Sequence, residues 1–266
     1  MTKQTTVLIT GMSKGIGKAI GKKLLQKGFH VIGTARNPEK IKDPLEGAHY
    51  LPLDLSNQKS VDNLIQSIQE KPIDILINNA GQSQIGPVEE MDIDKYRYLF
   101  EVNFFGMIQL TQAVLPQMRS RKNGCIINIG SLAGRFALPY QSSYCSTKFA
   151  VSGFTQSLRS EMKDFGVKVA LIEPNDIGTE ITPELNCPES SAYFPLLSKV
   201  YQQINSNMGK AESPDVIVTA VLKAIEKENP APIYVAGGNA GLLKLAQRLL
   251  PDRIAEKIIR KTYELG

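Results

Sequence analysis

The sequence predicts an α/β fold built on a doubly wound parallel sheet of about seven strands, with helices on both faces. Two observations carry this prediction. Short runs of strand-forming apolar residues alternate with segments whose apolar residues recur at helical spacing, and the first apolar run passes directly into a glycine-rich turn. Such alternation implies parallel strands covered on both sides. No repeat or linker divides the 266 residues, so we expect a single domain spanning 1–266.

Each element of the alternation has its own signature. Strands are expected at 7–10, 30–34, 50–53, 73–77, 125–129, 167–172 and 233–235. Helices are expected at 15–27, 61–68, 92–119 (as one helix or two abutting ones) and 140–165. Two segments depart from the pattern: 180–211, which is rich in Pro and Asn, and 241–263, a basic amphipathic stretch interrupted by Pro251. The first is expected to be a substrate loop and the second a helical extension.

Composition narrows the class of protein. The net charge is +5 and no block of five like charges occurs, so no nucleic-acid partner is expected. Cys125, Cys145 and Cys187 form no C-x-x-C pair and no His/Cys cluster, which predicts no metal site and suits a reducing compartment. No apolar run approaches the ~18 residues of a membrane span, and the N-terminus lacks a signal-peptide core. We therefore expect a cytoplasmic protein.

The glycine-rich turn has a chemical meaning at this position. Residues 10–17 read Thr-Gly-Met-Ser-Lys-Gly-Ile-Gly and lie between the first expected strand and the first expected helix. Gly11, Gly15 and Gly17 would let a pyrophosphate approach the backbone amides, and the helix N-terminus adds partial positive charge. The placement favours a Rossmann-type dinucleotide site. The alternative is a β–α turn that binds nothing.

The residues at the end of the second expected strand indicate which dinucleotide is bound. A carboxylate is typical there when the ribose 2′-hydroxyl is bound, but this chain has Ala35 followed by Arg36. Arg36, with Lys14 before the second glycine, suits a 2′-phosphate and predicts NADP(H); the alternative is two ordinary surface cations. Asp54, followed by Leu55, is expected to accept from the adenine amino group, with Ser56 better placed to cap the next helix.

Three side chains form the candidate catalytic group. Tyr144 and Lys148 are four apart in a helical stretch and therefore share a face. Ser131 follows the fifth expected strand, at the sheet edge where such folds bind ligands. An ammonium near the phenol would lower its pKa, and the serine would hold a substrate oxygen. Spacing alone is also compatible with an exposed helix pair.

These motifs together resemble the short-chain dehydrogenase/reductase family. The resemblance covers about 5–179 and includes the glycine turn, Asn78-Asn79-Ala80-Gly81 after the fourth strand, Asn103, Ser131, and Tyr144-x-x-x-Lys148. It implies that Tyr144 is the general acid or base, Ser131 polarises the substrate oxygen, and Lys148 binds the nicotinamide ribose and depresses the Tyr144 pKa. Asn103 would hold a water that extends the proton relay.

The resemblance also implies the rest of the cofactor contacts. Asn79 would lie near the adenosine ribose, and Thr179 with the Ile177 backbone would contact the nicotinamide carboxamide. The full expected set is Gly11, Ser13, Lys14, Gly15, Ile16, Gly17, Arg36, Asp54, Leu55, Asn79, Ala80, Gly81, Tyr144, Lys148, Ile177 and Thr179. One position departs from the family: Asn175 follows Pro174 where glycine is usual. Asn tolerates left-handed backbone, so the turn is expected to survive.

Apolar residues indicate the substrate. Tyr193, Phe194, Leu196, Leu197 and Met208, with Leu132, Phe136, Leu138 and Tyr140, would wall a site for a hydrophobic ketone, aldehyde or alcohol. The run at 34–38 and the long C-terminus loosely resemble hydroxysteroid and retinol dehydrogenases. Packing in the core or at a subunit interface is the alternative.

The C-terminal stretch and the assembly leave several hypotheses open. Segment 241–263 is expected to pack on the protein, cap the cleft, or touch a membrane surface weakly. The resemblance implies a homodimer or homotetramer formed through the helix carrying Tyr144. Besides the enzyme, a non-catalytic NADPH sensor and a membrane-surface lipid-binding protein remain as alternatives; the intact set of Asn103, Ser131, Tyr144 and Lys148 counts against the sensor.

Overall fold

The computed structural model describes residues 4–178, 183–209, 211–238, 241 and 249–265. It confirms the predicted fold class. Seven parallel strands form one sheet in the order β3-β2-β1-β4-β6-β7-β9. Their bounds are β1 Thr6–Ile9, β2 His30–Ala35, β3 His49–Pro52, β4 Ile75–Asn78, β6 Gly124–Ile129, β7 Val167–Pro174 and β9 Ile233–Ala236.

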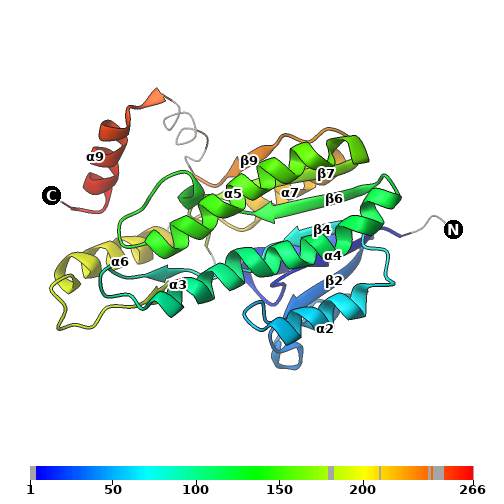
Figure 1. Ribbon diagram of the computed structural model, residues 1–266, viewed down its shortest axis with the longest axis horizontal. Coiled ribbons are helices and arrows are strands. Elements are labelled where there is room, and N and C mark those ends of the chain that lie inside the picture. The colour runs from blue at the N-terminus through cyan, green and yellow to red at the C-terminus, as the bar shows by residue number, and fades with distance from the viewer. Residues whose placement is uncertain (1–3, 179–182, 210, 239–240, 242–248, 266) are drawn as a thin grey trace.

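Helices cover both faces of this sheet. On one face lie α2 (Gln58–Ile68), α4 (Gly106–Ser120) and α5 (Ser142–Met162), with α4 and α5 crossing in front of the strands in Figure 1. On the other face lie α1 (Gly15–Gln26) and α7 (Asp215–Glu226), which contact each other. Strand residues alternate between the two apolar layers: Val7 and Ile9 face α1 and α7, whereas Leu8 faces α2 and α4.

The strand order determines where a ligand can bind. The chain winds outward from β1 to β3, then returns to place β4 on the other side of β1. The crossovers after β1 and β4 therefore leave the sheet in opposite directions and open a crevice at the carboxyl ends of these strands. The glycine turn follows β1, and the Asn79-Ala80-Gly81 segment follows β4.

The segment expected as one helix or two over 92–119 contains a π-helical turn. Helix α3 (Ile93–Phe100) passes into the π-helix η2 (Glu101–Phe105) and then into α4. Such turns insert an extra residue and often mark functional sites. Asn103 lies within this one.

The segment expected as a loop over 180–211 is partly helical. Helix α6 (Phe194–Gly209) fills its second half, and β8 (Glu184–Leu185) pairs with β5 (Gln84–Ile85). Leu197 and Val200 of α6 are buried against Ile85. The loop prediction was therefore wrong for 194–209, because tertiary burial stabilises a helix whose Pro and Asn content suggests none.

Within the extension expected over 241–263, α9 (Asp252–Thr262) begins directly after Pro251. Figure 1 places α9 and the C-terminus on the same side of the molecule as α6. Ile259 and Tyr263 contact the apolar cluster formed by Ile85, Leu197 and Val200. No helix among the residues described above is long and apolar enough to cross a membrane.

Candidate active site

A continuous cleft of ≈ 900 Å³ crosses the carboxyl ends of the central strands. Among the described residues, it brings together nearly all the predicted site residues: Gly11, Ser13, Lys14, Gly15, Ile16, Arg36, Asp54, Leu55, Asn79, Ala80, Gly81, Ser131, Tyr144, Lys148 and Ile177. Gly17 and Asn103 lie behind its wall. Thr179 lies outside the described residues.

The glycine turn has the geometry of a phosphate cradle. Gly11 and Gly15 have φ of 68° and 57°, a region that residues with a side chain rarely adopt. A Cβ on Gly17 would lie 2.4 Å from the Gly11 carbonyl oxygen and 2.5 Å from Asn79 Nδ2. Helix α1 begins here with no capping side chain and no acidic residue in its first turn. Its first amide groups are therefore available to an anion.

Asn79 supports this turn directly. Its Nδ2 donates to the carbonyl oxygens of Thr10 (2.9 Å) and Gly11 (3.1 Å). In return, Thr10 Oγ1 accepts from the backbone N–H groups of Asn79 (2.9 Å) and Ala80 (3.0 Å). Asn79 lines the cleft, as expected for a ribose neighbour, but its amide hydrogens hold the turn. The sequence analysis did not assign this role to Thr10.

The predicted ribose end of the cleft is cationic. Ala35 and Arg36 both line the wall where β2 ends, and Arg36 is exposed. Lys14 lines the same end. Asp54 Oδ1 accepts from the amide and hydroxyl of Ser56, so Ser56 anchors Asp54. The expected capping role of Ser56 was wrong: Asn57 caps α2 by accepting from the Ser60 N–H.

The three catalytic candidates meet at the other end. The Ser131 hydroxyl lies close enough to the Tyr144 phenol to lower its pKa. Lys148 Nζ lies 5.7 Å from the centre of the Tyr144 ring and donates to the Ile129 carbonyl oxygen at 3.1 Å. A Cβ on Gly134 would meet the Lys148 carbonyl oxygen at 2.6 Å, so glycine allows the turn after Ser131 to pack tightly on α5.

Burial changes the acidity of both proton-handling groups. Loss of hydration raises the pKa of the Tyr144 phenol, and the nearby Ser131 hydroxyl only partly offsets this. Loss of hydration lowers the pKa of Lys148 to about 8. Without a bound cofactor, the phenol is therefore neutral across physiological pH, and the Lys148 ammonium is close to its titration point.

Asn103 connects this group to the turn after β4. Its Oδ1 accepts from Gln82 N at 2.8 Å, and its Nδ2 donates to Gln82 O at 2.9 Å and Thr147 Oγ1 at 3.1 Å. Both amide hydrogens are thus taken. Gln82 and Thr147 are partners that the motif analysis missed, although Thr147 adjoins Lys148 in the sequence.

Asn175 adopts no left-handed backbone, contrary to the expectation that it would need one. Its N–H donates to the Ala236 carbonyl oxygen at 2.9 Å, which continues the pairing of β7 with β9. Left-handed residues occur instead at Gly237 and Gly238, and a Cβ on Gly238 would lie 3.4 Å from Asn175 Nδ2. Among the described residues, the glycines with positive φ at this edge of the sheet therefore follow β9 and not β7.

The predicted apolar wall is only partly correct. Leu132, Phe136, Leu138 and Met208 line the cleft. Among the described residues, Tyr140, Tyr193, Phe194, Leu196 and Leu197 do not, because α6 directs Ile204, Asn207 and Met208 toward the cleft and buries Leu197. Tyr193 instead hydrogen-bonds Glu89.

Helix α9 closes the substrate end of the cleft. Leu250 and the α9 residues Ala255, Ile258, Ile259 and Thr262 line it, together with Tyr263. Tyr263 lies close to Gln141, three residues before Tyr144, and loss of hydration raises the pKa of Tyr263 to about 12. The motif analysis missed both residues, because their contact joins distant parts of the chain.

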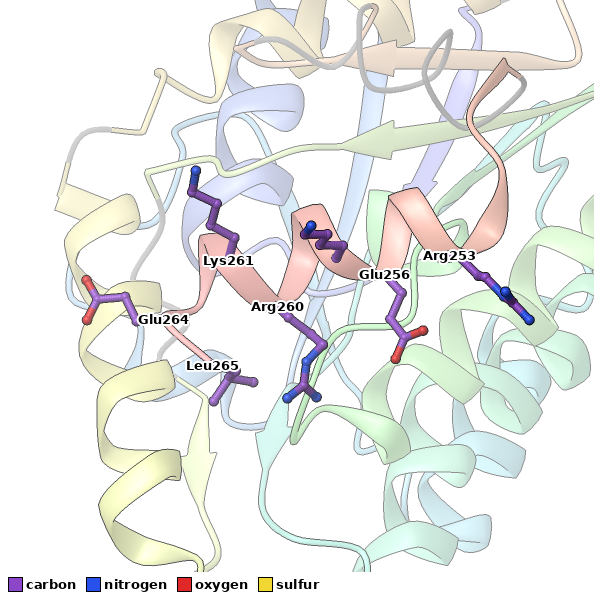
Figure 2. Close-up of a pocket in the computed structure, with 7 residues that line it drawn as sticks. Arg253, Glu256, Arg260, Lys261, Glu264 and Leu265 are labelled. Atoms are coloured by element: carbon purple, nitrogen blue, oxygen red, sulfur yellow. The ribbon is translucent and has the colours of Figure 1, made fainter.

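The outer side of α9 is a different environment. A hollow of ≈ 580 Å³ beside it is lined by Arg253, Glu256, Lys257, Arg260, Lys261, Glu264 and Leu265. Figure 2 shows these mostly charged side chains projecting from α9 and the segment that follows. None of the predicted catalytic groups lines this hollow; Ser131, Tyr144 and Lys148 line the cleft instead.

Comparisons with known proteins show the family of this chain. The family model for short chain dehydrogenase matches residues 5–190. The NADPH-dependent 3-dehydrocapnine reductase of Ornithobacterium rhinotracheale is 33% identical over 96% of this chain and 95% of its own. The 3-ketodihydrosphingosine reductase of Bacteroides thetaiotaomicron is 31% identical over 97% and 98%.

A solved structure extends the similarity to the fold. A short chain dehydrogenase from Burkholderia cenocepacia in complex with NADP is 26% identical, with a TM-score of 0.75 and 96% of each chain covered. The matched segment contains the glycine turn, Asn103, Ser131, Tyr144 and Lys148. This chain belongs to the short-chain dehydrogenase/reductase family of oxidoreductases, which act on alcohol and carbonyl groups.

Proposed function

We propose that this protein transfers a hydride between NADPH and a hydrophobic ketone, aldehyde or secondary alcohol, with Tyr144 as the general acid or base. The observation that carries this proposal is the meeting of Ser131, Tyr144 and Lys148 in one cleft with the glycine turn. The cofactor is NADP(H): Arg36 and Lys14 line the ribose end, and the similar proteins include an NADPH-dependent reductase and an NADP complex.

The side chains divide the work of proton transfer. NADPH, when bound, supplies the hydride. Ser131 holds the substrate oxygen, and Tyr144 Oη donates the proton that this oxygen takes up. Lys148 binds the nicotinamide ribose and places its positive charge beside the phenol, and Asn103 fixes the turn at Gly81 and Gln82. Both side-chain amide hydrogens of Asn103 are already donated to other residues. A relay water at Asn103 would therefore donate a hydrogen bond to one of its oxygen atoms.

A lipid-like carbonyl compound suits the substrate end. Its described wall includes Phe136, Leu138, Ile204, Met208 and Ile258. The names of two similar proteins, a 3-dehydrocapnine reductase and a 3-ketodihydrosphingosine reductase, support a long-chain 3-keto substrate. The test is NADPH oxidation over ketones graded in chain length. We expect kcat/KM to rise with the chain, and equal rates for short polar ketones would contradict the proposal. A nucleotide sensor would oxidise none of them.

The rate of reduction is expected to fall above pH 8. Because burial lowers the pKa of Lys148 to about 8, its ammonium is lost as the pH rises through that value, whereas the raised pKa of Tyr144 keeps the phenol protonated. kcat/KM for NADPH should fall about tenfold per pH unit above this point. The residual activity of Lys148→Arg should lack this break, since arginine keeps its charge. A flat profile for the unaltered protein would contradict the assignment.

A peripheral membrane contact through α9 is a second proposal. Leu249, Ile254 and Ile258 are 70%, 48% and 50% exposed, and Arg253 and Lys257 lie beside them. An apolar strip flanked by cations suits an anionic bilayer surface. We expect the protein to sediment with phosphatidylserine-containing vesicles, and Ile254→Ser/Ile258→Ser to remain in the supernatant. Equal sedimentation of both would exclude the α9 contact.

We also propose a cytoplasmic homodimer or homotetramer. Phe105 and Phe149 are each 45% exposed, on η2 and on the Tyr144-bearing helix α5, where a second copy would cover them. Cys125, Cys145 and Cys187 are free, as suits a reducing compartment. Sedimentation velocity should show a dimer or tetramer that Phe149→Glu dissociates; a monomeric unaltered protein would exclude the assembly.

A further inference from the structure

We propose that Asp176 binds an ammonium group carried by the substrate close to its carbonyl, so that the cleft selects amino ketones over neutral ketones. This inference rests on the proposed function. Asp176 follows β7 by two residues and lines the same cleft as Ser131 and Tyr144. The end of β7 lies beside the end of β6, the strand that leads to Ser131.

Asp176 lies among the groups that surround the reacting carbonyl. Its charge contributes to the raised pKa of Tyr263, so the two side chains are close. Tyr263 in turn lies close to Gln141, which precedes Tyr144 by three residues. Asp176, Tyr263 and Gln141 all line the cleft. A cation held by Asp176 would therefore lie near the carbonyl that Tyr144 serves.

The carboxylate of Asp176 differs from the other cleft carboxylates in its partners. Asp54 accepts from Ser56, and Glu184 pairs with Lys95 at 2.6 Å. Within the described parts of the chain, Asp176 has no hydrogen bond or ion pair, and loss of hydration raises the pKa of its carboxyl. Asp176 is at the same time exposed, so its carboxylate is open to a cationic group that enters the cleft.

The surroundings of Asp176 determine what kind of cation fits. Leu138 and Ile259 pack with Tyr263, the neighbour of Asp176, and Met208 and Ile258 line the same cleft. An apolar wall of this kind suits an alkyl chain. The one basic side chain among the described lining near the catalytic end, Lys148, donates to the Ile129 carbonyl oxygen. An amphiphilic compound with a chain, a carbonyl and an adjacent ammonium satisfies all of these features.

The test compares two ketones of equal chain length, one with an ammonium on the carbon next to the carbonyl and one with hydrogen there. We expect the unaltered protein to favour the amino ketone, and Asp176→Asn to lower the ratio of the two kcat/KM values about 10- to 100-fold, the loss of one charge-assisted hydrogen bond. Glu184→Gln removes the same charge from the same cleft and should leave the ratio unchanged.

Other outcomes overturn the proposal. An equal loss on both ketones would assign Asp176 a structural role, and a raised KM for NADPH at an unchanged ratio would assign it to the cofactor. If no ketone is reduced at all, the proposed function is wrong, and the ammonium site at Asp176 is then tested by ligand binding alone. Octylamine should then raise the melting temperature more than octanol in the unaltered protein and lose this advantage in Asp176→Asn. No preference for octylamine in the unaltered protein would exclude the site.

Discussion

Replacing Tyr144 with phenylalanine is expected to lower kcat for carbonyl reduction about 10²- to 10⁴-fold, the usual contribution of a positioned general acid. The phenol is the proposed proton donor, and its raised pKa keeps it protonated at the working pH. Phenylalanine keeps the ring beside Lys148 and removes the phenolic hydroxyl with its proton. The dissociation constant for NADPH, measured by fluorescence titration, should therefore change little.

Tyr96→Phe provides a matched control for this change. Tyr96 hydrogen-bonds Ser142 at 2.7 Å, at the start of the same helix, but does not line the cleft among the described residues. Its replacement removes a phenolic hydroxyl without touching the proposed donor, so turnover should be close to that of the unaltered protein. Full activity of Tyr144→Phe would refute the assigned role.

Arg36→Asp is expected to reverse the cofactor preference. The substitution removes the guanidinium proposed to pair with the 2′-phosphate and supplies a carboxylate that accepts from a 2′-hydroxyl. Loss of a charge-assisted hydrogen bond weakens NADPH binding about 10- to 100-fold, and repulsion between the new carboxylate and the phosphate adds to this. The measurement is the ratio of kcat/KM with NADPH to that with NADH.

Lys22→Asp makes the same charge change on the exposed surface of α1 and should leave this ratio unaltered. An equal fall in this ratio in both variants would mean that Arg36 contributes only to the general positive potential of the surface. An unchanged ratio in Arg36→Asp would mean that the ribose phosphate is bound elsewhere, with Lys14 as the next candidate.

The features that the sequence predicted best are those determined by local chemistry. The turn after β1 needs glycine because Gly11 and Gly15 have positive φ values. Tyr144 and Lys148 share a face of α5 because they lie one helical turn apart. Their meeting with Ser131 follows from the parallel sheet, which brings strand ends to one edge. These constraints act over a few residues, so the residue pattern records them.

The features that the sequence did not predict depend on tertiary contacts. Helix α6 has a composition typical of a loop and is stabilised by burying Leu197 and Val200. The contact of Tyr263 with Gln141 joins the end of the chain to the start of α5, and no local pattern indicates it. Asn175 was expected to tolerate a left-handed turn, but it has no positive φ; Gly237 and Gly238, which follow β9, have positive φ values.

Because α9 lies over the cleft, some residues that shape the substrate chamber are separate in sequence from those proposed to carry out the reaction. The described groups proposed to handle the cofactor and the proton all come from residues before 178, whereas α9 and Tyr263 contribute only to the chamber beyond them. Exchanging the last residues of this chain for those of a relative should therefore alter which compounds enter while the hydride and proton steps persist. Substrate specificity would then change through the C-terminal residues, while the proposed catalytic and cofactor-binding residues stay the same.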